Sequence, residues 1–329
     1  MTDTAPVQTH DSIVDRMTGG MVPDGLVEFA GSERLRPDGR PRPELRRELR
    51  QISDGRNVIT SLVALLAPVV LVALVVAIDH WLAIVAGIFF MAVLQNRLFL
   101  LHHEGAHRLL FRSRRWNDLI GVVLFGWLAF GTGTHSYRRA HTNHHRDEFG
   151  PKEPDFLLYA LYPIRLASMR RKLRRDLSGV SAYRILRPRL TGLFKRRYWR
   201  NSARFLLGQA FVFSLFALAG RPWLYLFLWV MPYVFVYQVI NRLRAIAEHG
   251  GMTRSSDRRA TSHHVHQSLL ARSIMVPCGI GYHLAHHVDS GIPFRNLARY
   301  TQILEEDGYI TPDMTWPSYR ALWKALASQ

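Results

Sequence analysis

Two pairs of apolar runs constrain this chain most, because they have the length and composition of membrane-crossing helices. The first pair covers residues 58–78 and 81–101, and the second pair covers residues 205–220 and 223–240. A helix rises 1.5 Å per residue, so a run of about 20 residues spans a hydrocarbon layer of roughly 30 Å. Only two residues separate the runs within each pair, and this favours a tight hairpin. We therefore predict an all-α, integral membrane protein with four transmembrane helices in two hairpins.

The distribution of charge predicts the orientation of these helices. The formal net charge is +18, and Lys and Arg concentrate between Tyr137 and Arg204, whereas the hairpin tips contain almost none. Because positively charged loops remain in the cytoplasm, this segment and both termini should lie on the cytoplasmic side of an inner or plasma membrane. Residues 1–56 are polar and should form a cytoplasmic arm with one short helix after Pro43. The sequence has no helix-turn-helix or RNA-binding motif, so we expect no nucleic acid partner.

Nine of the sixteen histidines follow a pattern that is typical of metal ligands. They are His103 and His107 in HHEGAH, His141, His144 and His145 in HTNHH, His283, His286 and His287 in HLAHH, and His249 in RAIAEHGG. Spacings of three and four residues place each set on one helix face, and neutral imidazole is a preferred ligand of iron, zinc and copper. One isolated pair would more often be a surface or core histidine. Three such sets, with the first set and His249 each directly following a membrane crossing, favour one metal centre on the cytoplasmic side.

The number of histidines predicts two metal ions. Transition metals in proteins take about four to six ligands, so nine imidazoles are too many for one ion. Zinc would serve hydrolysis, whereas a pair of irons can change oxidation state and activate oxygen. We therefore predict two iron ions as the cofactor and O2 as the co-substrate. The sequence assigns no catalytic residue beyond the metal ligands.

A fifth apolar run, residues 116–133, is weaker than the others. It contains four glycines, and charged residues lie close to its N-terminal side. If this run crossed the membrane, the histidines of HTNHH would lie on the opposite side from those of HHEGAH. Ligand sets separated by a hydrocarbon layer cannot share a site. The run should therefore lie in the cytoplasmic interface or re-enter it.

Four segments of the chain resemble the membrane fatty acid desaturase family. They are HEGAHRLLFRSRRWND, RRAHTNHH, AEHGG and YHLAHHVDSGIPFRNL, and the resemblance extends over roughly residues 59–309. It implies four membrane crossings, a cytoplasmic helical cap, a diiron centre, and oxygen-dependent insertion of a double bond into a fatty acyl chain. It implies that residues 57–329 form one desaturase-like domain. The three sets of histidines match the family's three histidine boxes, and His249 matches its additional ligand.

Two departures from the family pattern concern residues beside these ligands. Glu104 stands where aspartate is commoner, and Ala245 stands where some members have an asparagine, so a water-mediated ligand at position 245 is in doubt. Carboxylates near the ligands could orient the imidazole rings by accepting their second proton. The candidates are Glu104, Asp147, Glu148, Glu248 and Asp289. The remaining histidines of interest should act outside the metal coordination: His102, His135, His263, His264 and His266.

Three other functions remain open from the sequence. A related diiron hydroxylase, acting on an alkane, carotenoid or sphingolipid, begins with the same removal of hydrogen from an unactivated carbon. The segment from His103 to His107 also fits the HExxH pattern of a zinc protease, with Glu104 as the general base. That function would leave six of the nine histidines without a role. A non-enzymatic receptor on the same metal scaffold is the third alternative.

The chain should depend on partners for its substrate and its electrons. A lipid acyl chain is the expected substrate, and the membrane is the expected environment. The single cysteine, Cys278, excludes an intramolecular disulfide and a protein-bound iron–sulfur cluster, and the sequence has no HPGG haem segment and no GxGxxG motif. We therefore expect an external electron donor, such as an acidic ferredoxin or a similar small redox protein. The basic segments RRKLRRD and KRRYWR are the expected docking surface, although they could serve membrane orientation alone.

Overall fold

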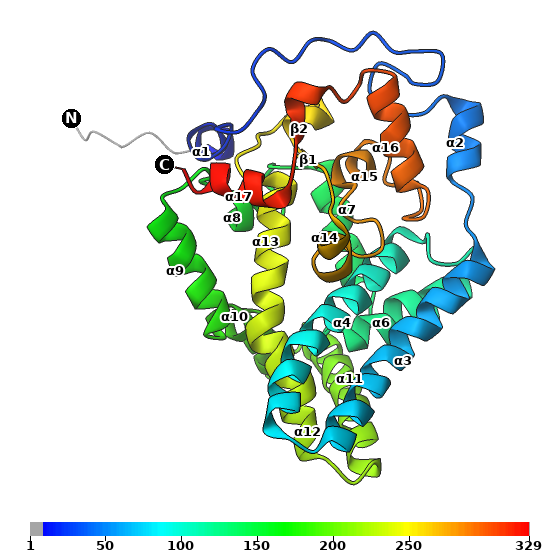
Figure 1. The fold of residues 1–329 in the computed structure, drawn as a ribbon, viewed down its shortest axis with the longest axis vertical. Coiled ribbons are helices and arrows are strands. Elements are labelled where there is room, and N and C mark those ends of the chain that lie inside the picture. Colours follow the sequence, from blue (N-terminus) through cyan, green and yellow to red (C-terminus); the bar gives the residue numbers. More distant parts are fainter. Residues whose placement is uncertain (1–8, 329) are drawn as a thin grey trace.

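The computed structural model describes residues 9–328, which form a bundle of long helices at one end and a cap of short helices at the other (Figure 1). The first half contains α1 (His10–Met17), α2 (Pro43–Leu49), α3 (Asp54–Ile78), α4 (Trp81–His107), α5 (Arg114–Trp116), the π-helix η1 (Asn117–Leu124), α6 (Phe125–Leu128), α7 (Ser136–Arg146), α8 (Phe156–Tyr159), α9 (Leu166–Leu177), α10 (Val180–Thr191) and the 3-10 helix η2 (Gly192–Phe194). The second half contains α11 (Trp199–Leu218), α12 (Trp223–Tyr225), the π-helices η3 (Leu226–Val230) and η4 (Pro232–Tyr237), α13 (Gln238–His249), the 3-10 helix η5 (Arg258–Ala260), α14 (Leu269–Ile274), α15 (His283–Val288), α16 (Leu297–Glu306), the 3-10 helix η6 (Pro312–Met314) and α17 (Tyr319–Leu326). Two short strands, β1 (His264–Val265) and β2 (Thr315–Trp316), pair in parallel, a detail that the all-α prediction did not include.

Four helices of the described chain are long and apolar enough to cross a membrane. They are α3, α4, α11 and the continuous helix Trp223–His249, which comprises α12, η3, η4 and α13. The prediction of a helical membrane protein with two hairpins is confirmed. Two of these helices continue beyond their apolar runs, and each ends in a histidine, His107 in one and His249 in the other.

The outward face of the bundle has the character of a lipid-facing surface. Leu66, Val70 and Leu74 on α3 are each more than half exposed. Large apolar side chains that face water at this density are rare in soluble proteins, whereas lipid tails are their natural solvent. The exposed side of α3 therefore supports its place in a bilayer.

The weaker apolar run does not form a membrane-spanning helix. Residues 116–133 fall into the end of α5, the π-helix η1 and the four-residue α6, and the chain then turns at Phe130, whose φ is +56°. These elements pack along α4 and against α11. The run is therefore absent from the four candidate spans, as the sequence predicted.

A proline explains part of the unusual winding in the last membrane helix. Pro232 begins η4 and has no backbone N–H, so it cannot donate the hydrogen bond that an α-helix would need there. The helix accommodates this loss by widening into π turns, which occur frequently near functional sites. It returns to α-helical geometry at Gln238 and ends at His249.

The N-terminal segment packs on the cap. The predicted short helix after Pro43 is α2, and the sequence analysis missed α1, which Thr9 caps by accepting a hydrogen bond from the Ser12 amide. Leu35 and Leu49 are buried in one core with Tyr300 and Leu304 of α16. The division of the chain at residues 56 and 57 into an arm and a desaturase-like domain stays a prediction, and the part of the arm before residue 9 lies outside the described residues.

Candidate metal centre

The nine predicted histidines come from four helices that converge where the bundle meets the cap. His107 is the last residue of α4, His103 lies one turn before it, and His249 is the last residue of α13. The other six lie on two short helices, α7 and α15. The two membrane helices thus supply three ligand candidates, and the two cap helices supply six.

These histidines divide into two groups without a remainder. In each group, one ligand atom from every residue lies within 4.8 Å of the others. The five-histidine group consists of His103, His107, His141, His145 and His286. The four-histidine group consists of His144, His249, His283 and His287. All nine side chains are buried or half-buried.

Helical spacing explains how α7 and α15 each serve both groups. Residues four apart lie on the same side of a helix, so His141 and His145 on α7 join the five-histidine group together. On α15, the pair with this spacing is His283 and His287, which joins the four-histidine group. The third histidine of each helix faces the other group. HTNHH therefore contributes two histidines to the five-histidine group and one to the other, whereas HLAHH contributes one to the five-histidine group and two to the other.

The ring nitrogens fit metal coordination better than hydrogen bonding. His249 Nδ1 donates to the Thr261 carbonyl at 2.8 Å, so the neutral ring has a lone pair at Nε2. This Nε2 lies 2.9 Å from His283 Nε2. In the five-histidine group, His141 Nε2 lies 2.8 Å from His107 Nε2 and 3.1 Å from His145 Nε2. Two nitrogens that bind one ion at about 2.1 Å and at a right angle are about 3 Å apart.

Two further ring nitrogens support the same conclusion. Nε2 of His286 and Nε2 of His287 are buried, and neither has a hydrogen-bond partner within residues 9–328. Buried polar atoms are nearly always paired, so unpaired nitrogens in both groups need an explanation. A metal ion in each group would satisfy them. The residues present therefore fit two ions.

Burial keeps most of these rings in the form that binds metals. Burial lowers the pKa of His286 well below its ordinary value, and the neighbouring His107 and His144 lower this pKa further. The same causes, burial first and then adjacent histidines, lower the pKa of His141 and of His145. His144 is the exception: burial alone would lower its pKa, but Glu153 raises the pKa above the ordinary value. A neutral imidazole has a free lone pair, whereas an imidazolium has none.

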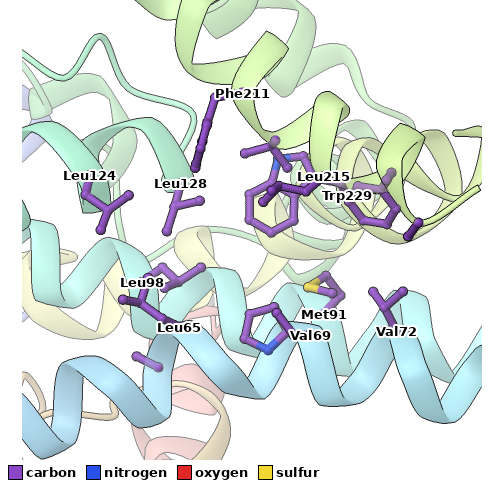
Figure 2. A pocket seen from close by; sticks show the side chains of 15 residues that line it. Leu65, Val69, Val72, Met91, Leu98, Leu124, Leu128, Phe211, Leu215 and Trp229 are labelled. Atoms are coloured by element: carbon purple, nitrogen blue, oxygen red, sulfur yellow. The ribbon is translucent and has the colours of Figure 1, made fainter.

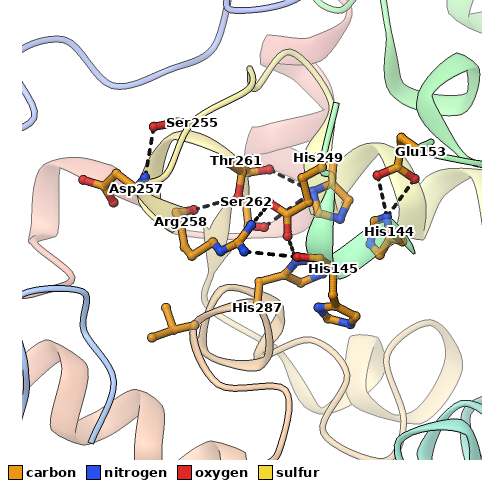
Figure 3. A network of polar contacts seen from close by, with 12 residues as sticks. His144, His145, Glu153, His249, Ser255, Asp257, Arg258, Thr261, Ser262 and His287 are labelled. Atoms are coloured by element: carbon orange, nitrogen blue, oxygen red, sulfur yellow. Dashed lines mark hydrogen bonds and ion pairs between the residues drawn. The ribbon is translucent and has the colours of Figure 1, made fainter. Parts of the chain in front are cut away.

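Carboxylates and a carbonyl hold the outer nitrogens of the four-histidine group. Glu153 accepts from His144 Nδ1 at 2.9 Å, as Figure 3 shows. Glu148 accepts from His287 Nδ1. Glu248 lies 3.5 Å from His283 Nδ1, which is close enough for an ion pair, but the two groups do not form a hydrogen bond.

The other three candidate carboxylates have different partners. Glu104 accepts from the Phe294 amide at 3.0 Å, and Asp289 pairs with Arg46. Asp147 accepts from the Lys152 amide. The sequence analysis missed Glu153, because it follows α7 in a loop and no helical spacing links it to His144. The two acidic residues in KEPD follow HTNHH closely, and this proximity could have indicated a carboxylate partner for one of its histidines.

The remaining histidines lie outside both groups. His102 Nδ1 lies 2.8 Å from the Gly121 carbonyl, and His135 contacts Arg138. His263 is buried and bonds to the Gly250 carbonyl at 2.7 Å, immediately after His249 in the chain. His264 is also buried and pairs with Glu305, whereas His266 is exposed.

Comparison with known proteins agrees with the geometry. The sequence profile of the fatty acid desaturase family matches residues 79–323, which include all nine histidines. The chain belongs to the fatty acid desaturase family. A curated relative, the dihydrorhizobitoxine desaturase of Bradyrhizobium elkanii, is 25% identical over 242 residues, which cover 68% of each chain. This desaturase-family protein is therefore an oxidoreductase of the membrane, and the predicted resemblance is confirmed.

Proposed function

We propose that this protein is an oxygen-dependent diiron desaturase that introduces a double bond into a lipid acyl chain. The observation that carries the proposal is the division of nine buried or half-buried histidines into groups of five and four. An apolar cavity between membrane helices, lined in part by α4, accompanies it. Two irons in these groups would supply the change of oxidation state that oxygen activation requires. The nine histidines would be their ligands, and O2 would be the co-substrate.

The apolar cavity offers a place for the acyl chain. It has a volume of about 380 Å³ and lies among α3, α4, η1, α6, α11 and η3, with only apolar residues in its lining. Figure 2 shows Met91 and Leu98 of α4 on one side of the cavity and Leu124, Leu128 and Trp229 on the opposite side. Leu98 precedes His103 by five residues, which corresponds to about 7.5 Å along the helix. A chain in this cavity would thus approach the level of the histidines.

The protein's own residues would orient the ligands and exclude water. The carboxylates of Glu148 and Glu153 and the Thr261 carbonyl fix the Nδ1 atoms, so that the Nε2 atoms face inward. Burial of both groups keeps bulk water away from a reactive oxidant. A reaction at an unactivated carbon requires both contributions from the protein, the orientation of the metal ligands and the exclusion of water.

Desaturation is preferred to hydroxylation on the strength of the comparisons. The family is named for fatty acid desaturation, and the relative from Bradyrhizobium elkanii is also named as a desaturase. Expression in a host of known lipid composition, followed by mass spectrometry, tests the proposal. We expect acyl chains two hydrogens lighter, and acyl chains one oxygen heavier would identify a hydroxylase instead. Dihydrorhizobitoxine belongs in the substrate panel, because the relative's name contains it.

The topology should place the histidines and both basic segments on the cytoplasmic side. Cys278 can be replaced to give a cysteine-free background, in which single cysteines report accessibility. We expect cysteines at the exposed Ser113 and Ser178 to react with an impermeant reagent from the cytoplasm. Cysteines at the exposed hairpin tips, Asp79 and Arg221, should react only from the opposite side. Labelling of Ser113 and Ser178 from different sides would contradict the arrangement.

An external electron donor should dock on α9. This helix exposes Arg170, Arg171 and Arg174, whereas Lys172 lies over the Tyr162 ring and Asp176 pairs with the buried Arg242. Residues 9–328 provide no ion-pair partner for these three arginines, and Lys172 and Asp176 anchor the helix. An acidic ferredoxin or a similar small redox protein would complement this charge.

Charge reversal tests this docking surface. Replacing Arg170, Arg171 and Arg174 by Glu should slow reduction by an acidic donor by about tenfold or more, because electrostatic steering is lost. Raising the salt concentration to about physiological levels, where the screening length is about 8 Å, should slow the native protein similarly. Stopped-flow absorbance measures the rate. Reversal of three exposed arginines in the N-terminal arm, Arg36, Arg42 and Arg47, is the matched control, and equal slowing there would contradict a docking site on α9.

A further inference from the structure

The two histidine groups differ in what their outer ring nitrogens contact. In the four-histidine group, each Nδ1 faces an oxygen atom. The pairs are His144 with Glu153 at 2.9 Å, His249 with the Thr261 carbonyl at 2.8 Å, His283 with Glu248 at 3.5 Å, and His287 with Glu148. Three of these four oxygens belong to carboxylates.

The five-histidine group has no such carboxylates in the part of the chain that the structure describes. None of its histidines forms a hydrogen bond or an ion pair with Asp or Glu, in contrast to the three contacts of the other group. Glu148 approaches His145 to within 4.8 Å but makes no hydrogen bond to it. The negative charge is therefore concentrated on one side of the centre.

These carboxylates are fixed in place. The Glu148 side chain is 2% exposed and lies 2.7 Å from Arg258, and the Glu248 side chain is 9% exposed and lies 2.6 Å from Arg244. The Glu153 side chain is fully buried, accepts from the Asp155 amide at 3.1 Å, and has its ion pair with His144. A buried carboxylate without partners would be costly, so these positions are specified by their contacts.

We propose that Glu148 and Glu153 are positioning residues that make the two metal positions inequivalent, with Glu248 adding a third negative charge beside His283. A carboxylate that accepts the Nδ1 proton makes the opposite Nε2 a stronger electron donor. The four-histidine position then binds its ion more tightly than histidines alone would. It also favours the higher oxidation state, so the first electron from the external donor goes to the iron in the five-histidine position. This inference rests on the proposed function, in which both groups bind iron.

The experiment compares iron-loaded proteins in which single carboxylates are neutralised. The full-length protein is loaded anaerobically with ⁵⁷Fe and examined by Mössbauer spectroscopy and by competition with a chelator. In Glu153→Gln and Glu148→Gln, we expect one of the two iron signals to change while the other stays as in the unmodified protein. The affinity of that one iron should fall about 10- to 100-fold. The unchanged signal shows within the same sample that the protein is folded.

Two matched controls remove a nearby carboxylate that does not contact a histidine. Glu104→Gln removes the carboxylate beside His103 but keeps an oxygen that can accept from the Phe294 amide, and Asp289→Asn removes the carboxylate that follows α15 and loses its ion pair with Arg46. Both should keep the two iron signals of the unmodified protein. Changes in both signals for Glu153→Gln, no change in either, or the same change in the controls would overturn the inference. An unmodified protein that binds no iron would overturn the proposed function, and the inference with it.

Discussion

Replacing His144 or His286 by alanine should abolish turnover, because each substitution removes a ligand candidate from a different group. His144 belongs to the four-histidine group and His286 to the five-histidine group. Loss of a residue that only orients a ligand costs about 10- to 100-fold in affinity or activity, and loss of the ligand itself should cost more. We expect each variant to retain about one iron and to show no measurable desaturation. Iron analysis and oxygen consumption measure the two effects.

His266→Ala is the matched control for these variants. His266 is exposed and lies outside both groups, so its loss should leave iron content and turnover as in the unmodified protein. Thermal unfolding of all three proteins separates a local loss of metal from a general loss of structure. Full iron content and full activity in His144→Ala or in His286→Ala would contradict the assignment of that histidine as a ligand.

Local sequence patterns predicted the parts of this protein that depend on neighbours along the chain. The apolar runs predicted the four spans, and spacings of three and four predicted that each set of histidines shares a helix. The division into groups of five and four needed the relative rotation of α7 and α15, which no single helix determines. The sequence did predict that residues 116–133 form no span. That argument requires only that the histidines of HHEGAH and HTNHH lie on the same side of the membrane.

Contacts between distant segments were beyond the sequence analysis for a physical reason. Glu153 reaches His144 only because the loop after α7 folds back, and Arg258 reaches Glu148 from a segment more than one hundred residues later. Such pairs leave no periodic signal, since the chain between them has no fixed spacing. The parallel pairing of β1 with β2 is a similar case, because its strands are two residues long. Pro232 was visible in the sequence, but its effect, a π-helical turn, depends on packing around it.

Gly105 gives the clearest example of a residue whose role only the packing reveals. It lies between His103 and His107 on α4, and a Cβ atom added to it would lie 2.6 Å from the Cα of Gly121 on η1. Its carbonyl also accepts hydrogen bonds from Asn117 at 2.9 Å and from Arg138 at 3.0 Å. The two helices therefore meet backbone to backbone, at the turn that carries two of the five histidines.

Gly105→Ala should consequently destabilise the protein and also prevent the five-histidine group from holding its iron. No flexible side chain can move aside, so α4 and η1 must separate, and overpacking of this kind costs about 1–3 kcal/mol. The same movement shifts His103 and His107 away from His141 and His286. We expect a lower unfolding temperature, about one iron instead of two, and little turnover.

Gly55→Ala is the matched control, because Gly55 also lies in a helix but has nothing within 4 Å of an added Cβ. Helix propensity favours alanine over glycine by about 1 kcal/mol, so this control should be neutral or slightly stabilising. Two irons and an unchanged unfolding temperature in Gly105→Ala would show that α4 and η1 are not held this closely.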